Sequence, residues 1–533
     1  MSAAFVTLAE QVVDDLLATS PTVAHEAGDH RFDHLIEDLS DDSVARTITL
    51  LRSRSRELAA LDASSLDAEE AVDRDLLSAG VEARLFELAT VDERTWNPLV
   101  HNPGVLLYAL LAREVGPAHE RLAALSARLT ALPDALATAE KVLGECPRIH
   151  VETAISQLKG TVGLVRDEVP TLLRQAPHLR TTVEPAVRGA LVALERHHDY
   201  LTGLLGRAHR DPRLGRALWE ARLRHALDSD LSAAQILDGA RADLDRAGAQ
   251  IRETAAELTG SDDVRAALAT LARDHPDDAT IVGKAEHALL EATEFVRSHD
   301  LLTVLDDPIE IVPMPEFARG VAVAYCDAPG PLEKRVLPTF FAISPTPAGW
   351  SAERVASFYR EYNDHMLFNL SVHEAMPGHY LQLAHARRFR GTTRARALCG
   401  SGSFVEGWAV YVEELMADLG FGGLPVRMQQ LKMQLRMILN AILDQLVHCE
   451  DLSEAEAMAM MTDQGFQEDG EAAGKWRRAL LTSTQLSTYY VGYTEVSAIA
   501  RSQPAATTRH DWLNAMLAHG SPAPRHLARL LGS

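Results

Sequence analysis

Apolar residues recur three and four positions apart along almost the whole chain, which is the period of an amphipathic helix. The stretches from Leu122 to Leu143 and from Ala233 to Leu258 show this pattern clearly. Proline-containing breaks such as Cys146-Pro147 and His275-Pro276 separate the stretches, and helices are expected to end there. Since no repeat of fixed period is present, the pattern predicts a mainly α fold of packed helices and not a solenoid.

The pattern changes once, between about residues 307 and 347. This region holds three short runs of β-branched or aromatic residues bounded by proline and glycine: Ile309 to Pro313, Val321 to Cys326 and Val336 to Ser344. Such runs predict a small β-sheet. Helical periodicity returns from Ser351 and continues to the end of the chain.

The composition is that of a folded globular protein. Of 533 residues, 47% are hydrophobic and 24% are charged, so the chain can bury a core. The net charge of -23, from 75 acidic and 52 basic residues, repels phosphate backbones and anionic lipid headgroups. We therefore expect neither nucleic acid nor membrane as a partner, while a homodimer is compatible with the sequence.

Cysteine usage and the N-terminal segment bear on location. The four cysteines show no CxxC spacing, which favours neither a disulfide framework nor a thiolate zinc site. Residues 1–20 carry Glu10, Asp14 and Asp15 and no basic start, so they predict an amphipathic helix and not a signal peptide. No apolar run reaches the length of about 18 residues that a membrane span needs. From these features we expect a cytoplasmic protein.

The chemistry of the chain is concentrated in one motif, in which a glutamate directly follows the first of two histidines. His373 and Glu374 are separated from His379 by residues 375–378. Neutral imidazoles are zinc ligands, and a carboxylate beside a zinc-bound water can take its proton. The usual HExxH motif spaces its histidines by four residues, whereas here the spacing is six.

A six-residue step carries the second histidine about 240° around a regular helix, away from the face of the first. Pro377 lacks a backbone donor and Gly378 tolerates unusual dihedral angles, so we expect a bulge or break between the two histidines. Such a break permits both histidines to reach one metal ion, but it does not require them to do so.

A third candidate ligand, Glu406, follows His379 by 27 residues and lies in a helical segment. A third ligand from a following helix is the arrangement of glutamate zincins, which leaves the fourth zinc position for water. Glu413 lies two turns further on the same face, where it either orients a ligand histidine or is a solvated helix charge. A second His-Glu pair, at residues 25–30, has no such following segment, and we interpret it as a turn at a helix end.

The His373-Glu374 pair with His379, followed by the Glu-Gly-Trp sequence that begins at Glu406, resembles the signature of a known family. It is similar to the bacterial domain-of-unknown-function 885 family, which is grouped with zinc metallopeptidases, and the resemblance covers nearly the whole chain. It implies a helical zinc-metallopeptidase-like fold. It also implies that His373, His379 and Glu406 are zinc ligands and that Glu374 is the general base.

Amide hydrolysis also needs a donor to the developing oxyanion, and Tyr489 and His448 are our candidates. Both lie in stretches that carry the resemblance: the helix with Arg436, Asp444 and His448, and the segment from Gln485 to Gly492. Ordinary roles are also open, because His448 can pair with Asp444 and Tyr489 can simply pack. Arg436 either anchors a substrate carboxylate or pairs with Asp444.

Together these residues predict a zinc-dependent hydrolase that uses Zn²⁺ and Glu374 to cleave amide bonds of short peptides. Residues 1–300 are expected to form a helical lobe covering the cleft, and residues 301–533 a catalytic lobe with the sheet, at about 307–347, beside that cleft. Two alternatives stay open. One is a zinc amidohydrolase acting on a small non-peptide amide, and the other is a helical binding protein with a vestigial metal site.

Overall fold

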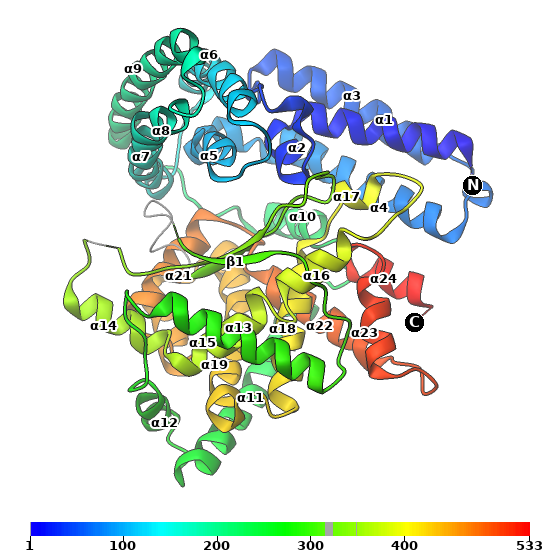
Figure 1. Cartoon of the computed structure of the whole chain (residues 1–533), viewed down its shortest axis with the longest axis vertical. Coiled ribbons are helices and arrows are strands. Elements are labelled where there is room, and N and C mark those ends of the chain that lie inside the picture. Colours follow the sequence, from blue (N-terminus) through cyan, green and yellow to red (C-terminus); the bar gives the residue numbers. More distant parts are fainter. Residues whose placement is uncertain (1, 315–322, 348, 533) are drawn as a thin grey trace. The chain divides into compact units, whose positions relative to one another are not determined.

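The computed structural model describes residues 2–314, 323–347 and 349–532. The described chain is mainly helical with one small sheet, which confirms the predicted fold class (Figure 1). Its contacts divide it into two compact units, each built from separate stretches of sequence. Unit 1 comprises Met1–Pro212, Pro329–Leu337 and Gly391–Cys399, and unit 2 comprises Arg213–Ala328, Pro338–Arg390 and Gly400–Ser533.

Unit 1 is helical around two hydrophobic clusters. Its α-helices are α1 (Ala3–Thr19), α2 (Pro21–Ala27), α3 (Asp41–Ala59), α4 (Ala68–Phe86), α5 (Gly104–Ala112), α6 (Ala118–Val142), α7 (Arg148–Gly163), α8 (Val169–Leu173), α9 (Arg180–Leu204) and α17 (Ala395–Leu398). Phe5, Leu51 and Leu77 join α1, α3 and α4 in one cluster, while Leu125 and Leu194 join α6 and α9 in the other. The helix expected over residues 1–20 is therefore present, and its apolar face is buried.

Unit 2 contains the sheet and the remaining helices. The helices are α10 (Arg216–Leu227), α11 (Ala233–Thr259), α12 (Val264–Leu271), α13 (Ile281–Ser298), α14 (Ala352–Glu361), α15 (Asp364–Glu374), α16 (His379–Ala386), α18 (Gly402–Asp418), α19 (Gly423–Cys449), α20 (Glu454–Ala459), α21 (Asp469–Leu481), α22 (Ser487–Arg501), α23 (Arg509–Leu517) and α24 (Pro524–Leu531). Helix α11 shows how the local sequence sets a boundary. The Ser232 hydroxyl and the Gln235 side chain cap each other's backbone N–H groups at its start.

The sheet has three short strands, β1 (Ile309–Pro313), β2 (Ala324–Asp327) and β3 (Thr339–Ile343), in the order β1-β3-β2. β1 is parallel to β3, and β2 is antiparallel to it. All three strands lie where the sequence predicted them, although Val321 and Ala322 of the second predicted run fall outside the described residues. β2 is an edge strand, since no other described strand pairs with its far side.

The first break between the units lies after Pro212, whereas we expected the lobes to divide near residue 300. Helices α10 to α13 belong to unit 2, because α11 packs along α19 and α13 packs along α15. Their apolar faces join the same clusters as the helices that follow the sheet. The periodicity of a sequence shows that a helix buries one face, but not which helix covers that face.

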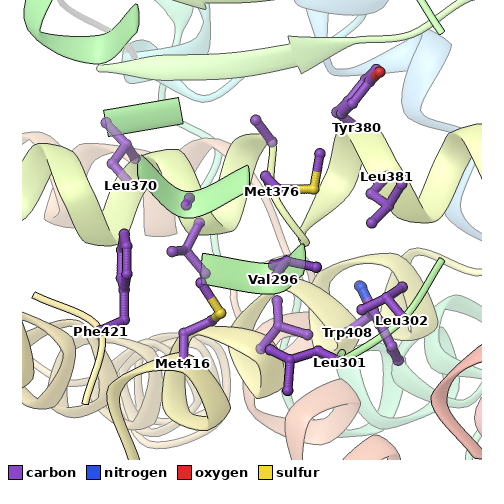
Figure 2. Close-up of a cluster of buried hydrophobic side chains, with 14 of the residues drawn as sticks. Val296, Leu301, Leu302, Leu370, Met376, Tyr380, Leu381, Trp408, Met416 and Phe421 are labelled. Atoms are coloured by element: carbon purple, nitrogen blue, oxygen red, sulfur yellow. The ribbon is translucent and has the colours of Figure 1, made fainter. Parts of the chain in front are cut away.

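The histidine motif packs on the largest hydrophobic cluster of unit 2. Figure 2 shows Met376 and Tyr380, which flank the start of α16, among Leu381, Leu301 and Trp408. Trp408 and Leu381 are completely buried. Since close-packed side chains shift little, this cluster fixes the backbone that carries the motif.

Membrane-spanning helices and disulfide bonds were two further features considered from the sequence. Within the ranges that the structure describes, no helix is both long enough and apolar enough to cross a membrane. The four cysteines form no disulfide with one another.

Candidate metal centre

Two short helices carry the histidines of the motif. The side chain of Asn363 accepts backbone hydrogen bonds from the first turn of α15, and that helix ends at Glu374. α16 begins at His379, so His373 lies in the last turn of one helix and His379 is the first residue of the next. The break that the sequence predicted between the histidines is confirmed.

Close backbone contacts hold the turn between α15 and α16. The peptide bond before Pro377 is cis, and the Gly378 N–H donates to the α15 backbone at 2.9 Å. A Cβ at Gly378 would lie 1.9 Å from the His373 carbonyl oxygen, so only glycine fits here. The Trp408 indole N–H donates to the Pro377 carbonyl at 2.9 Å, which ties the turn to α18.

Helix α18 brings Glu406 to the histidines. The helix is capped by Ser401 and crosses α22 where Gly407 meets Gly492. A Cβ at Gly407 would lie 2.3 Å from the Gly492 carbonyl carbon, so the two helix backbones touch only because neither residue has a side chain. Glu406 directly precedes this contact, and its position depends on it.

The three side chains meet at a distance that suits a zinc ion. Nε2 of His373 and Nε2 of His379 each lie 3.5 Å from Oε2 of Glu406. Tetrahedral zinc, with bonds of about 2.0–2.1 Å, holds its ligand atoms about 3.3 Å apart. Oε2 of Glu406 is buried and makes no hydrogen bond within the described part of the chain. Such an oxygen is costly unless a cation balances it, so the residues present fit a metal ion.

Glu413 is buried, with 3% side-chain exposure, and is not a solvated helix charge. Its Oε1 lies 2.6 Å from Nδ1 of His373, and its Oε2 accepts a hydrogen bond from Asn369 at 2.6 Å. When Nδ1–H of His373 donates to Glu413, the ring's lone pair is on Nε2, the nitrogen that faces Glu406. Glu413 therefore orients one candidate ligand. Nδ1 of His379 has no comparable partner among the described residues.

Burial and charge act against each other in this cluster. Burial raises the pKa of Glu374, and the imidazoles of His373 and His379 offset only part of that rise. Burial also raises the pKa of Glu406, but the two imidazoles outweigh it and hold this pKa well below its usual value. Burial lowers the pKa of His373, while Glu406 and Glu413 raise it well above its usual value. Glu406 thus stays anionic, and Glu374 has the raised proton affinity of a general base.

Glu374 also connects the cluster to the sheet. The backbone of Cys326, in the edge strand β2, hydrogen-bonds its carboxylate. The candidate base and the edge strand of the sheet are therefore neighbours in unit 2.

The surroundings of His448 leave it no ring nitrogen for an oxyanion. Its Nδ1 accepts from the Leu214 N–H at 3.3 Å, and its Nε2 lies 2.9 Å from the Thr482 carbonyl oxygen. Asp444, at 4.0 Å, accepts four other hydrogen bonds, from Trp219, Thr484 and Ser487. His448 is buried and holds backbone segments together, which is the ordinary role that the sequence left open.

Tyr489 and Arg436 have different surroundings. The Tyr489 hydroxyl oxygen accepts from Arg478 at 3.2 Å and from Gln485 at 3.5 Å, so its own hydrogen is committed to neither. The O–H of Tyr489 is therefore available to donate a hydrogen bond to an oxyanion. Arg436 pairs with Glu471, and the pairing with Asp444 that the sequence left open is absent from the described contacts.

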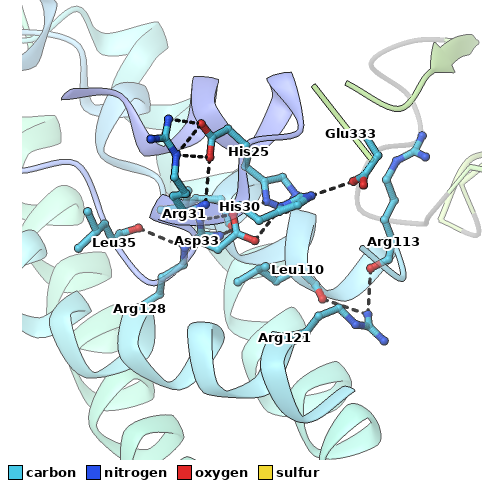
Figure 3. A network of polar contacts seen from close by, with 12 residues as sticks. His25, His30, Arg31, Asp33, Leu35, Leu110, Arg113, Arg121, Arg128 and Glu333 are labelled. Carbon is cyan, nitrogen blue, oxygen red and sulfur yellow. Dashed lines mark hydrogen bonds and ion pairs between the residues drawn. The ribbon is translucent and has the colours of Figure 1, made fainter. Parts of the chain in front are cut away.

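The histidines at residues 25–30 form a second cluster, in unit 1 (Figure 3). His25 Nδ1 lies 2.7 Å from Asp33, and His30 lies 3.0 Å from Asp33 through Nδ1 and 2.8 Å from Glu333 through Nε2. The hydrogen bond to Asp33, helped by that to Glu333, raises the pKa of His30 to about 9. Both ring nitrogens of His30 are thus hydrogen-bonded to carboxylates, and we interpret this cluster as an ion-pair network at the predicted turn after α2.

Unit 2 also contains a buried cation that the sequence analysis did not single out as a site residue. Lys475, on α21, is only 5% exposed and has no hydrogen bond or ion pair with any described residue. Its place in an amphipathic helical pattern gave no reason to single it out, because lysines in such patterns usually lie in solvent.

A family model described as "Bacterial protein of unknown function (DUF885)" matches residues 21–531. No curated protein matches the chain. A solved structure from Shewanella oneidensis, described as a candidate lipoprotein of unknown function, is 26% identical with a TM-score of 0.83, over 100% of both chains. One from Colwellia psychrerythraea, also described as a candidate lipoprotein, is 16% identical with a TM-score of 0.83, over 99% of this chain and 98% of that chain.

A third match is an M32 carboxypeptidase from Deinococcus radiodurans R1. It is 12% identical with a TM-score of 0.35, over 98% of this chain and 96% of that chain, a likeness too low to support an argument about chemistry.

These matches contradict the predicted cytoplasmic location. The Shewanella oneidensis protein, which shares this fold over the whole of both chains, is described as a candidate lipoprotein, a class that covalently attached lipid holds at a membrane. The expectation rested on cysteine spacing, on the first 20 residues and on the lack of an apolar span. None of these features is specific to a cytoplasmic protein.

Proposed function

The chain belongs to the DUF885 family of bacterial proteins of unknown function, and we propose that it is a zinc-dependent hydrolase of peptide bonds. The observation that carries the proposal is the convergence of His373, His379 and Glu406, with 3.5 Å between each Nε2 and the buried Oε2. Two imidazoles and one carboxylate are the protein ligands of many catalytic zinc sites, which keep a fourth position open.

Each residue of the centre has a distinct task in this proposal. His373, His379 and Glu406 would hold the ion, and Glu413 keeps His373 in the tautomer that binds through Nε2. Zinc, when bound, supplies Lewis acidity toward water and toward the scissile carbonyl. Glu374 takes a proton from the attacking water and passes it to the leaving amine. Burial of Glu374, which raises its pKa, suits both transfers.

The neighbouring sheet edge favours a peptide as the substrate. An extended peptide can pair with the edge strand of a sheet through its backbone, without recognition of particular side chains. β2 offers such an edge, and the contact between Cys326 and Glu374 would place a peptide paired there beside the base. Tyr489, with its uncommitted hydroxyl hydrogen, is the candidate oxyanion donor.

The test compares zinc content and peptide-library hydrolysis in the wild type, in Glu374→Gln and in chelator-treated protein. We expect Glu374→Gln to keep its zinc and to lose about 10²–10⁴-fold in kcat, because only the proton acceptor is removed. Glu353→Gln, at an exposed glutamate on α14, is the matched control and should leave the rate unchanged.

Two results would count against the proposal. Full activity in Glu374→Gln would remove the assigned base. Zinc binding without cleavage of any peptide would instead favour a small-amide hydrolase or a binding protein.

A further inference from the structure

The interior of unit 2 contains a group of charged side chains around α19 and α21, separate from the metal centre. Two cations in it are matched by carboxylates: Lys432 lies 2.8 Å from Glu361, and Arg436 pairs with Glu471. The Tyr362 hydroxyl also donates to Glu471, at 3.2 Å. In each of these two pairs the carboxylate balances the charge of its cation.

Two further cations in the group, Lys475 and Arg478, form no ion pair with a carboxylate among the described residues. Glu471 attracts Lys475, but it is already paired with Arg436. Lys475 is 5% exposed and has neither a hydrogen bond nor an ion pair there. Within the described chain, Arg478 donates to two neutral groups, the Gln485 side chain at 2.7 Å and the Tyr489 hydroxyl at 3.2 Å. Burial, with repulsion by Arg436 and Arg478, outweighs the attraction of Glu471 and holds the pKa of Lys475 well below its usual value.

An excess of buried positive charge is costly to the fold. Transfer of an ammonium group from water to a protein interior costs several kcal/mol unless an anion or hydrogen bonds compensate it. Removal of Lys475 would relieve that cost, so its presence is explained best by a ligand that needs it. The missing compensation is one anionic group, small enough to approach a lysine and an arginine together.

Contacts within unit 2 connect this group to the metal centre. Arg478 donates to Tyr489, which lies on α22 one helical turn before Gly492. Gly492 touches Gly407, and Gly407 directly follows Glu406. A ligand that reached from Arg478 past Tyr489 would therefore run toward the zinc ligands over a distance that a few peptide residues span.

We propose that Lys475, with Arg478, binds the C-terminal carboxylate of a peptide whose scissile bond lies at the His373, His379 and Glu406 centre. The inference rests on the proposed function and deepens it, because it makes the enzyme one that acts from the C-terminal end of its substrate. Among the groups of an unmodified peptide, the C-terminal carboxylate is the one anion that every substrate shares. Hydrolysis adds one water across the C–N bond and gives a new carboxylate and a new amine, with no redox change.

The first test measures cleavage of an N-acetylated hexa-alanine peptide and of its C-terminal amide by the zinc-loaded, full-length wild type. A charge-assisted contact to the carboxylate predicts a kcat/KM about tenfold or more higher for the free acid than for the amide. Lys475→Met should lose that preference, and Lys475→Arg should retain part of it because it keeps the charge. Arg477→Met removes an exposed positive charge two residues further on α21 and should retain the whole preference.

The second test measures binding without turnover. Calorimetry on zinc-loaded Glu374→Gln should show the acid binding about tenfold or more tightly than the amide, and Glu374→Gln/Lys475→Met should bind both alike. The thermal midpoint of Lys475→Met should be at or above that of the wild type, which shows that lost binding is not lost folding.

Equal cleavage and equal binding of acid and amide by the wild type would overturn the inference, and so would an unchanged preference in Lys475→Met. Absence of all cleavage would count against the proposed peptidase. The calorimetric comparison of acid with amide would then still decide whether Lys475 binds a peptide carboxylate.

Discussion

At the scale of single residues, the contact between His373 and Glu413 has the clearest consequence. Glu413 is nearly sealed from solvent and lies 2.6 Å from Nδ1 of His373. Glu413→Gln removes the charge that fixes the histidine tautomer, and we expect zinc affinity to fall about 10–100-fold. Competition with a chelating dye measures this change. Glu414→Gln, at the next residue of α18, is the control, and equal affinities in the two variants would contradict the orienting role.

His30 gives a prediction for stability and pH. Its pKa, raised to about 9, lies above the usual 6.5, so its contribution to stability is complete below pH 6.5 and is lost as pH rises through 9. Because the side chain is 28% exposed, we expect a contribution of about 2 kcal/mol and not the larger value that the full shift implies.

Thermal denaturation from pH 6 to pH 10 tests that contribution. The midpoint of His30→Gln should lie several degrees below that of the wild type near pH 6, and the gap should close by about pH 10. His119→Gln, at an exposed histidine of α6, should show no such closing gap. A gap that stayed constant with pH would show that protonation of His30 is not its source.

Residues close together in sequence were the most predictable. His373, His379 and Glu406 were predicted to form one cluster, and the structure brings them together, with Glu374 interacting electrostatically with all three. Glu413 stayed ambiguous because its helical position does not show whether it is buried. Lys475 was missed for the same reason, since its burial depends on helices far away in sequence.

At the scale of elements, the predicted break between α15 and α16 shows what local chemistry determines. Pro377 and Gly378 interrupt the helix whatever packs around them, so the break could be predicted from sequence. The crossing of α18 and α22 could not, because it depends on two glycines, Gly407 and Gly492, that are 85 residues apart in the chain.

That crossing yields a third prediction. A Cβ at Gly407 would lie 2.3 Å from the Gly492 backbone, so Gly407→Ala should push the helices apart, cost about 2–3 kcal/mol of stability and displace Glu406. Zinc affinity and thermal midpoint should fall together. Gly474→Ala is the control, because that exposed glycine of α21 has no neighbour within 4 Å and alanine should stabilise its helix slightly.

Wild-type affinity and midpoint in Gly407→Ala would show that the close approach of the backbones does not position Glu406. A lower thermal midpoint with unchanged zinc affinity would also show that the contact does not position Glu406. It would nevertheless confirm that a Cβ at Gly407 strains the packing of α18 on α22.

At the scale of the whole molecule, composition and periodicity were sufficient for the fold class but not for its division. A mainly α chain with a small sheet was predicted and is present. The sequence predicted one division near residue 300, whereas each unit combines segments that are distant in sequence. Helices α10 to α13, which precede residue 300, belong to unit 2 with the metal centre. Which apolar faces meet is a property of the packed chain, and no local pattern encodes it.

The measurement that tests the central claim most directly is anomalous diffraction at the zinc edge from crystals of the full-length protein grown with zinc. We predict a peak bonded to Nε2 of His373, Nε2 of His379 and Oε2 of Glu406 at about 2.0–2.2 Å. No peak at these residues, or zinc bound only at the His25, His30 and Asp33 network, would contradict the claim that this chain carries a catalytic metal centre.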